Sequence, residues 1–188
     1  MKAEGGKSVD VIKNPEEAVD RYGVMVYRLA LAQTKNPADA EDVFQEVFLR
    51  LVRGGRSFES DEHLKAWLIR VTVNCSRSLW RTVLRRGEIP MEDGDLPCGD
   101  AQPPDGHSEV YDGVMRLPPK YRAVIHLYYY EGLPIESIGA ALKIGYGAAA
   151  KRLSRARKLL KRELTEGEYH DEHSDGIPES RRHTAHSG

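Results

Sequence analysis

The chain has 188 residues, and although 30% of them are charged, its net charge is only −1. The two cysteines, Cys75 and Cys98, are too few for a disulfide framework or a four-ligand zinc site. No apolar run approaches the roughly 20 residues that a membrane-spanning helix needs, and the N-terminus lacks the apolar region of a signal peptide. We therefore expect a cytoplasmic protein without membrane insertion.

The small net charge hides a strong segregation of charge along the chain. Residues 64–86 contain six Lys or Arg and no acid, residues 87–109 contain seven acids and no Lys or Arg, and residues 151–162 contain seven bases and no acid. Two basic segments separated by an acidic one indicate a polyanion contacted at two places, although solvent-exposed helices also carry such runs.

Two helices are predicted in the first third of the chain. The first begins after Asn14, where a capping side chain precedes a proline and two glutamates, and its apolar stripe extends to Ala32. Asn36 and the proline after it separate it from a second helix over residues 39–52. The apolar face of this second helix comprises Ala40, Val43, Phe44, Val47 and Leu51, and its opposite face carries Asp39, Asp42, Gln45, Glu46 and Arg50.

The acidic face of the second helix has three interpretations. Asp42 and Glu46 lie one turn apart, so they could chelate a metal or present a negative stripe to a protein partner. A metal site would need further ligands on other helices, and the Glu-x-x-His pattern of carboxylate-bridged sites is absent. The residue types leave a solvated face and a partner surface equally open, and favour both over a metal site.

A third helix is predicted from Leu64 to Arg81. Its core stripe comprises Leu64, Trp67, Leu68, Val71, Cys75 and Leu79. A second row, at steps of four, three and four, comprises Arg70, Asn74, Arg77 and Arg81. Three arginines and an asparagine suit backbone phosphates plus one base edge. Trp80 lies beside this row, where it could either stack on an unpaired base or pack in the core.

The next segment, residues 87–108, has no apolar periodicity and is acidic, which is typical of a flexible linker. It divides the chain into two small helical domains, residues 14–86 and 109–164, so an all-α fold is predicted. Residues 1–13 are expected to be a flexible N-terminus and residues 165–188 a disordered tail. The histidines of this tail could bind metal, but its composition favours disorder.

A helix-turn-helix is predicted within residues 133–164. Ile135, Ile138 and Leu142 form a short apolar stripe before a break at Gly145. A longer basic segment follows, whose apolar stripe comprises Ala149, Leu153, Ala156 and Leu160. A short helix, a tight turn and a basic helix are how many proteins present a helix to the DNA major groove. An ordinary pair of helices is the alternative.

Two sets of motifs carry a resemblance to a known family. Residues 39–48 (DAEDVFQEVF), with Trp67-Leu68-Ile69-Arg70 and Asn74, resemble region 2 of bacterial sigma-70 factors of the extracytoplasmic-function group. Residues 117–122 (LPPKYR), Glu136-Ser137-Ile138-Gly139 and residues 151–157 (KRLSRAR) resemble region 4 of the same group. The resemblance covers residues 14 to 164, with both regions in the expected order.

This resemblance implies a sigma factor that joins core RNA polymerase and directs initiation at promoters, without cofactor or catalysis of its own. It implies docking of Asp39, Asp42, Gln45 and Glu46 on the beta-prime clamp, a second contact with the beta flap, and an anti-sigma factor as a further partner. Arg70, Asn74, Arg77 and Arg81 would bind the melted minus-10 strand. Minus-35 duplex contacts are expected from Tyr146, Ala148, Lys151, Arg152 and Arg155.

Several positions depart from the family pattern. Gly139 stands where the family commonly has alanine, and Lys143 where it has a turn glycine. Gly147-Ala148-Ala149 replaces the usual Gly-Thr-Val, which bears on the promoter sequence more than on the architecture. A helix-turn-helix regulator that binds duplex DNA without polymerase is the alternative function, and a metal-carboxylate helical enzyme is a more distant third.

Overall fold

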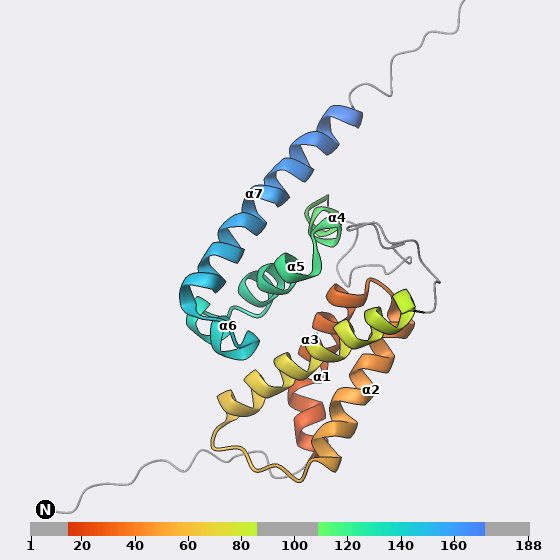
Figure 1. The fold of residues 1–188 in the computed structure, drawn as a ribbon, viewed down its shortest axis with the longest axis vertical. Helices are drawn as coiled ribbons and strands as arrows, with labels where there is room; N and C mark the ends of the chain where they lie inside the picture. Colours follow the sequence, from red (N-terminus) through yellow and green to blue (C-terminus); the bar gives the residue numbers. More distant parts are fainter. Residues whose placement is uncertain (1–14, 86–108, 172–188) are drawn as a thin grey trace, which may run out of the picture.

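The computed structural model describes residues 15–85 and 109–171 (Figure 1), with side chains described for residues 15–82 and 109–165. This part of the chain contains helices and no strand. The helices are α1 (Pro15–Thr34), α2 (Pro37–Arg53), α3 (Asp61–Arg85), α4 (Glu109–Arg116), α5 (Pro119–Ile125), the π-helix η1 (His126–Tyr130), α6 (Ile135–Leu142) and α7 (Tyr146–Asp171). The predicted all-α fold is confirmed. None of the described helices is long and apolar enough to cross a membrane. The predicted linker and Cys98 lie outside the described residues.

Helices α1, α2 and α3 pack against one another and form the first half of the structure. The turn between α1 and α2 follows the predicted signal, because the Asn36 side chain accepts hydrogen bonds from the backbone N–H of Ala38 (2.9 Å) and Asp39 (3.2 Å). Pro37 occupies the first turn of α2, where a missing N–H costs nothing. Leu29, Val47 and Leu68 are fully buried between the three helices.

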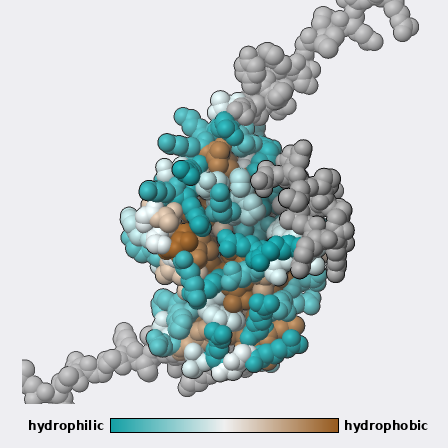
Figure 2. Space-filling model, in the orientation of Figure 1, coloured by the Kyte–Doolittle hydropathy of each residue, from teal (hydrophilic) through white to brown (hydrophobic). Residues whose placement is uncertain are grey.

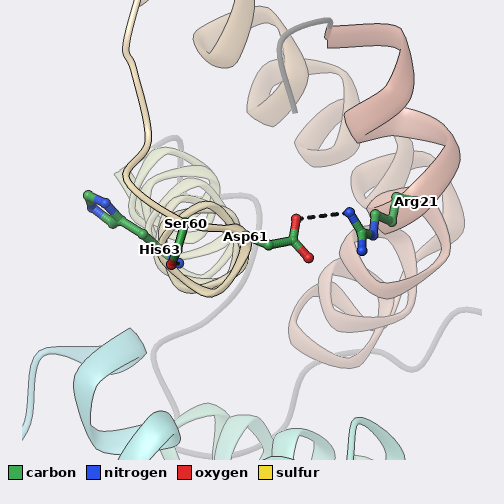
Figure 3. A network of polar contacts seen from close by, with 4 residues as sticks. All are labelled: Arg21, Ser60, Asp61 and His63. Carbon is green, nitrogen blue, oxygen red and sulfur yellow. Dashed lines mark hydrogen bonds and ion pairs between the residues drawn. The ribbon is translucent and has the colours of Figure 1, made fainter. Parts of the chain in front are cut away.

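Polar contacts at the start of α3 set how it leaves the preceding loop. The backbone N–H of His63 donates to Ser60 Oγ at 3.1 Å, which caps the first turn. Asp61 accepts a hydrogen bond of 3.2 Å from the Arg21 guanidinium of α1 (Figure 3). Half of the Arg21 side chain is exposed, so this ion pair orients α3 more than it stabilises the fold.

The second half comprises α4 to α7, with α4 and α5 lying along α7. The side chain of Arg122 is fully buried, and its Nη1 donates to the carbonyl oxygens of Met115 (2.7 Å) and Leu117 (2.9 Å). This arginine therefore holds the turn between α4 and α5. In the predicted apolar stripe of the basic helix, Ala149, Leu153 and Ala156 are buried and Leu160 is partly buried.

The helix that follows Pro119 changes geometry part-way along. It is α-helical to Ile125 and π-helical from His126 to Tyr130, and Gly132, which follows it, has a φ of 62°. The wider turn leaves His126 and Leu127 buried and Tyr129 and Tyr130 exposed. Helix α7 also continues past Leu164 to Asp171, where the sequence predicts a disordered tail from residue 165. No proline follows Leu164 within these residues to stop the helix.

The two halves pack together, with α3 against α6, and α1 against α5 and η1 (Figure 1). Their buried apolar side chains form one continuous cluster. This packing changes which face of α3 is buried: Ile69 and Val73, outside the predicted stripe, are buried, while Val71 and Leu79 are only partly buried. Helix α3 has neighbours on both sides, because α1 and α2 cover one side and α6 another.

Candidate functional site

The acidic face of α2 is a solvent-facing surface with an apolar end. Asp42 and Gln45 are exposed, whereas Asp39 is half-buried, and burial together with the charge of Asp42 raises the pKa of its carboxyl group. Glu46 accepts a hydrogen bond of 2.6 Å from Arg50 Nε, so it is already paired within the helix. Within the described residues, no group of three or more His, Cys, Asp or Glu side chains could hold a metal ion.

The same stripe of α2 continues beyond the residues predicted from the sequence. Leu49 and Val52 follow Gln45 at steps of four and three, and their side chains are 42% and 57% exposed. An exposed apolar pair beside exposed polar residues is typical of a protein-binding surface. The sequence could have indicated these two apolar residues, because Leu49 and Val52 lie on the polar face of the predicted helix, in the same row as Asp42 and Gln45.

The predicted row on α3 is divided by the packing of the two halves. Asn74, Arg77 and Arg81 are exposed and lie along one side of α3. Arg70 is partly buried, because its Nε donates to the carbonyl oxygen of Ala141 at 3.2 Å and its Nη2 to that of Ala140 at 3.5 Å. The structure therefore brings three of the four residues together on an open surface and places the fourth against α6.

The two tryptophans of this region have different surroundings. Trp67 is buried, as its spacing predicts, and packs edge-on against Phe58 with 5.6 Å between the ring centroids. Trp80 is partly buried, and its Nε1 donates to the Gln33 carbonyl oxygen at 3.2 Å. This bond packs the edge of the Trp80 ring against the end of α1.

The basic helix α7 presents charge on two faces. Tyr146, Ala148, Lys151 and Arg155 are exposed near its start, and Arg152 is partly exposed. Arg157 lies on another face, where its Nε donates to Tyr129 Oη at 2.8 Å and its guanidinium group lies over the rings of Tyr128 and Tyr129. The predicted duplex-binding residues therefore form one surface at the start of α7, and Arg157 belongs to a different one.

The turn before α7 holds that surface close to α6. Lys143 adopts a left-handed conformation with a φ of 53°, and the Ile144 N–H donates to the Gly139 carbonyl oxygen at 2.9 Å. A Cβ atom on Gly139 would lie 2.9 Å from the carbonyl oxygen of Ile144. The glycine that departs from the family pattern thus leaves space for the turn.

An apolar groove of about 410 Å³ lies between α4, η1 and α7. Val110, Val114, Leu160 and Leu164 line it, and Arg157 and Lys161 are also in its walls. Figure 2 shows one face of the molecule, which is mostly hydrophilic with small apolar patches.

The two halves of the chain match two regions of one known protein family. Residues 18–86 match the family model of sigma-70 region 2, and residues 107–160 match that of sigma-70 region 4. The chain belongs to the sigma-70 family. The region 2 match includes the α2 stripe and the α3 row, and the region 4 match includes the turn and the start of α7.

The relatives of this sigma-70 family member point to its extracytoplasmic-function group. It is 34% identical over 157 residues to the ECF RNA polymerase sigma factor SigE of Mycolicibacterium smegmatis, which covers 78% of the chain and 60% of that relative's length. It is 28% identical over 163 residues to the ECF RNA polymerase sigma factor SigW of Bacillus subtilis, which covers 79% of the chain and 87% of that relative.

Two solved structures share the fold of this sigma-70 family member. The sigma factor RpoE of Bartonella quintana, solved with the anti-sigma factor NepR, has a TM-score of 0.65 at 22% identity, over 82% of this chain and 98% of that one. The structure of CnrH with the cytosolic domain of CnrY has a TM-score of 0.59 at 24% identity, over 81% of this chain and 88% of that one.

Proposed function

We propose that this chain is a sigma factor that joins core RNA polymerase and directs it to promoters. The observation that carries the proposal is that each family region coincides with its own exposed surface: the α2 stripe and α3 row in region 2, and the start of α7 in region 4. The chain itself performs binding and no catalysis in this proposal. A regulator that acts without polymerase would leave the region 2 match unexplained.

Docking on the beta-prime clamp is assigned to the exposed stripe of α2. Asp42 and Gln45 supply a negative charge and an amide, and Leu49 and Val52 add apolar area that the partner would remove from water. Asp39 and Glu46 contribute less directly, since one is half-buried and the other is paired with Arg50. The apolar groove beside α7 fits a second polymerase segment, for which we propose the beta flap.

DNA contacts are assigned to two surfaces of different character. Asn74 and the neighbouring arginines Arg77 and Arg81 suit melted minus-10 strand, because unpaired bases expose the edges that an amide can read. Lys151, Arg152 and Arg155, with Tyr146 and Ala148, suit minus-35 duplex at the start of a helix that enters the major groove. One similar solved structure holds the anti-sigma factor NepR and another holds the cytosolic domain of CnrY, and we propose an anti-sigma factor as a further partner of this chain.

The decisive experiment measures binding of the full chain to purified core RNA polymerase by fluorescence anisotropy, followed by transcription from a library of randomised promoters. We expect the wild-type chain to bind core and the double variant Asp42→Ala/Gln45→Ala to bind it at least tenfold more weakly. The matched control is Glu17→Ala/Asp20→Ala, which removes exposed acids of α1.

The possible outcomes separate the hypotheses. Selective loss in the α2 variant supports the docking surface, and core-dependent transcripts support the sigma function. Failure of the wild-type chain to bind core contradicts the proposal, and duplex binding without core binding would favour the stand-alone regulator. Equal core binding by the α2 variant and the control would show that docking uses another surface.

A further inference from the structure

The α3 row lies beside a second row of side chains on the same helix, and this second row faces the core. The α3 row comprises Arg70, Asn74, Arg77 and Arg81, and the inner row, one position earlier in each case, comprises Ile69, Val73, Ser76 and Trp80. The first three members of the inner row are at most 3% exposed. Because both rows belong to one helix, the inner row fixes the direction in which the outer row points.

The inner row is least buried at its last member. From Arg77 to Thr82, the last residue of α3 whose side chain is described, no side chain is fully buried. Trp80 is partly buried and makes a directed contact, since its Nε1 donates to the Gln33 carbonyl oxygen at 3.2 Å. Partial burial and this hydrogen bond therefore orient the part of α3 that carries Arg77 and Arg81.

The acceptor of this bond occupies a fixed position. Gln33 lies in the last turn of α1, where carbonyl oxygens lack intrahelical partners, and it is 2% exposed. The turn is closed by hydrogen bonds from Thr34 Oγ1 to the Ala30 carbonyl oxygen (3.0 Å) and from Lys35 N–H to that of Leu31 (2.8 Å). Helices α1 and α3 belong to the first half, so the bond is made within that half.

We propose that Trp80 is a positioning residue for promoter binding: its hydrogen bond to Gln33 fixes the rotation of the last turns of α3, so that Arg77 and Arg81 continue the line of Asn74. The inference rests on the proposed function, because it requires the α3 row to bind the melted minus-10 strand. Trp80 itself does not touch the strand in this arrangement. A strand along the row meets two arginine charges one turn apart only if the helix keeps this rotation.

The test measures how many charges the row places on a single strand. The full chain is assembled with core RNA polymerase, and its binding to a fluorescent minus-10 single strand is followed by anisotropy at several salt concentrations. The strand comes from a promoter recovered from the randomised library. Each phosphate neutralised on a single strand contributes about 0.7 to the slope of log K against log salt. The proteins compared are the wild-type chain, Trp80→Phe, Arg81→Ala and the double variant.

We expect Trp80→Phe to lower the affinity about threefold to tenfold and the slope by about 0.7, as Arg81→Ala does, because a phenyl ring has no N–H to donate. The double variant should resemble either single variant, since both remove the same contact with the strand.

The matched control is Phe44→Leu, which alters a partly buried aromatic ring of α2 and should leave the slope unchanged. A general loss of stability would lower the fraction of folded protein without changing the slope. Thermal unfolding of each variant, followed by circular dichroism, measures that loss separately.

A second variant isolates the N–H in case Trp80→Phe does not fold. Benzothienylalanine at position 80 keeps the size of the indole ring and replaces its N–H by sulfur, so only the hydrogen bond to Gln33 is lost. We expect the slope to fall by the same amount, about 0.7. A wild-type slope in this variant, together with a reduced slope in Trp80→Phe, would assign the effect to the ring, through packing or base stacking, and would overturn the positioning role.

Unchanged slopes in both Trp80 variants would overturn the inference even if the affinity falls. Additive losses in the double variant would also overturn it, because Trp80 and Arg81 would then act independently. Failure of the wild-type chain to bind the strand contradicts the proposed function and this inference with it, whereas binding that is insensitive to Trp80 contradicts this inference alone.

Discussion

Gly139 faces the carbonyl oxygen of Ile144 so closely that a Cβ atom would lie 2.9 Å from it. The same two residues are joined by the hydrogen bond from Ile144 N–H to the Gly139 carbonyl oxygen, which closes the turn between α6 and α7. The turn thus depends on the absence of a side chain in a helix, where glycine is ordinarily unfavourable.

Gly139→Ala is expected to destabilise the protein although alanine is the better helix former. Overpacking against backbone costs about 1–3 kcal/mol, which exceeds the gain of about 0.5–1 kcal/mol from helix propensity. Urea unfolding followed by circular dichroism measures the change. The control is Gly147→Ala in the first turn of α7, where a Cβ meets nothing within 4 Å and a small gain is expected. Equal effects of the two substitutions would contradict the steric argument.

Lys143→Gly is expected to stabilise the protein. Lys143 has a φ of 53° and a ψ of 45°, a left-handed conformation that costs a residue with a Cβ about 1 kcal/mol and costs glycine little. The free energy of unfolding should rise by about 0.5–1 kcal/mol, the usual scale of such backbone effects. Lys143→Ala, which removes the charge and keeps the Cβ, should leave stability nearly unchanged, and a gain of the same size in this variant would assign the effect to charge.

Arg152→Ala/Arg155→Ala is expected to abolish binding to a minus-35 duplex while sparing core polymerase binding. Both side chains lie on the surface at the start of α7, and each lost base or phosphate contact costs about 1–3 kcal/mol. Electrophoretic mobility shift at fixed salt measures the loss. Lys161→Ala, a basic residue of the same helix that lines the apolar groove, is the control. Unchanged duplex binding by the double variant would remove this surface from the DNA interface.

Leu49→Ala/Val52→Ala is expected to weaken core binding about threefold to tenfold. The reason is that the binding free energy loses about 25 cal/mol for each Å² of apolar area that is no longer buried against the polymerase. Thermal stability should change little, since both side chains are largely exposed in the free protein. Val24→Ala on α1 is the control, because Val24 is 63% exposed and lies outside the α2 stripe. Titration of labelled core polymerase measures the two affinities. Equal affinities for the double variant and the control would restrict docking to the polar residues of α2.

Glu131→Gln is expected to lower stability at pH 7 and to matter less in acid. His126 is the largest cause of the lowered pKa of the Glu131 carboxyl group, and Lys65 and Arg28 add to it. A carboxyl group with a lowered folded pKa contributes stability above its unfolded pKa, about 4.3, and that contribution is lost as pH falls through the folded pKa. Unfolding of both proteins at pH 7 and below pH 4 tests this. A difference that stays constant with pH would show that the charge of Glu131 contributes nothing.

The helices and most of their buried faces could be predicted because they follow from local pattern. Asn36 caps α2, Trp67 is buried, and the stripe of Ala149, Leu153 and Ala156 faces the core, as the spacing indicates. Each depends on residues within a few positions in the chain, where helical geometry relates sequence directly to side-chain direction.

The contacts that alter the candidate site could not be predicted in this way. The bond from Arg70 to Ala141 joins residues 71 positions apart, and that from Arg122 to Gln33 joins residues 89 positions apart. Arginine at a regular step on a helix has the same pattern whether it faces solvent, a phosphate or a carbonyl oxygen. Only the neighbour that packs against α3 distinguishes these cases.

The sequence by itself determined the all-α class, most of the residues that form the α2, α3 and α7 surfaces, and the family motifs, because helical periodicity, caps and charge runs are local properties. The tertiary structure alone decided that Arg70 and Trp80 are used between helices and that Ile69 and Val73 are buried. It also showed that the two halves share one core. The physical reason is that burial and hydrogen bonding depend on which surfaces meet. When two segments far apart in the chain pack together, the residue spacing within each segment does not record the contact.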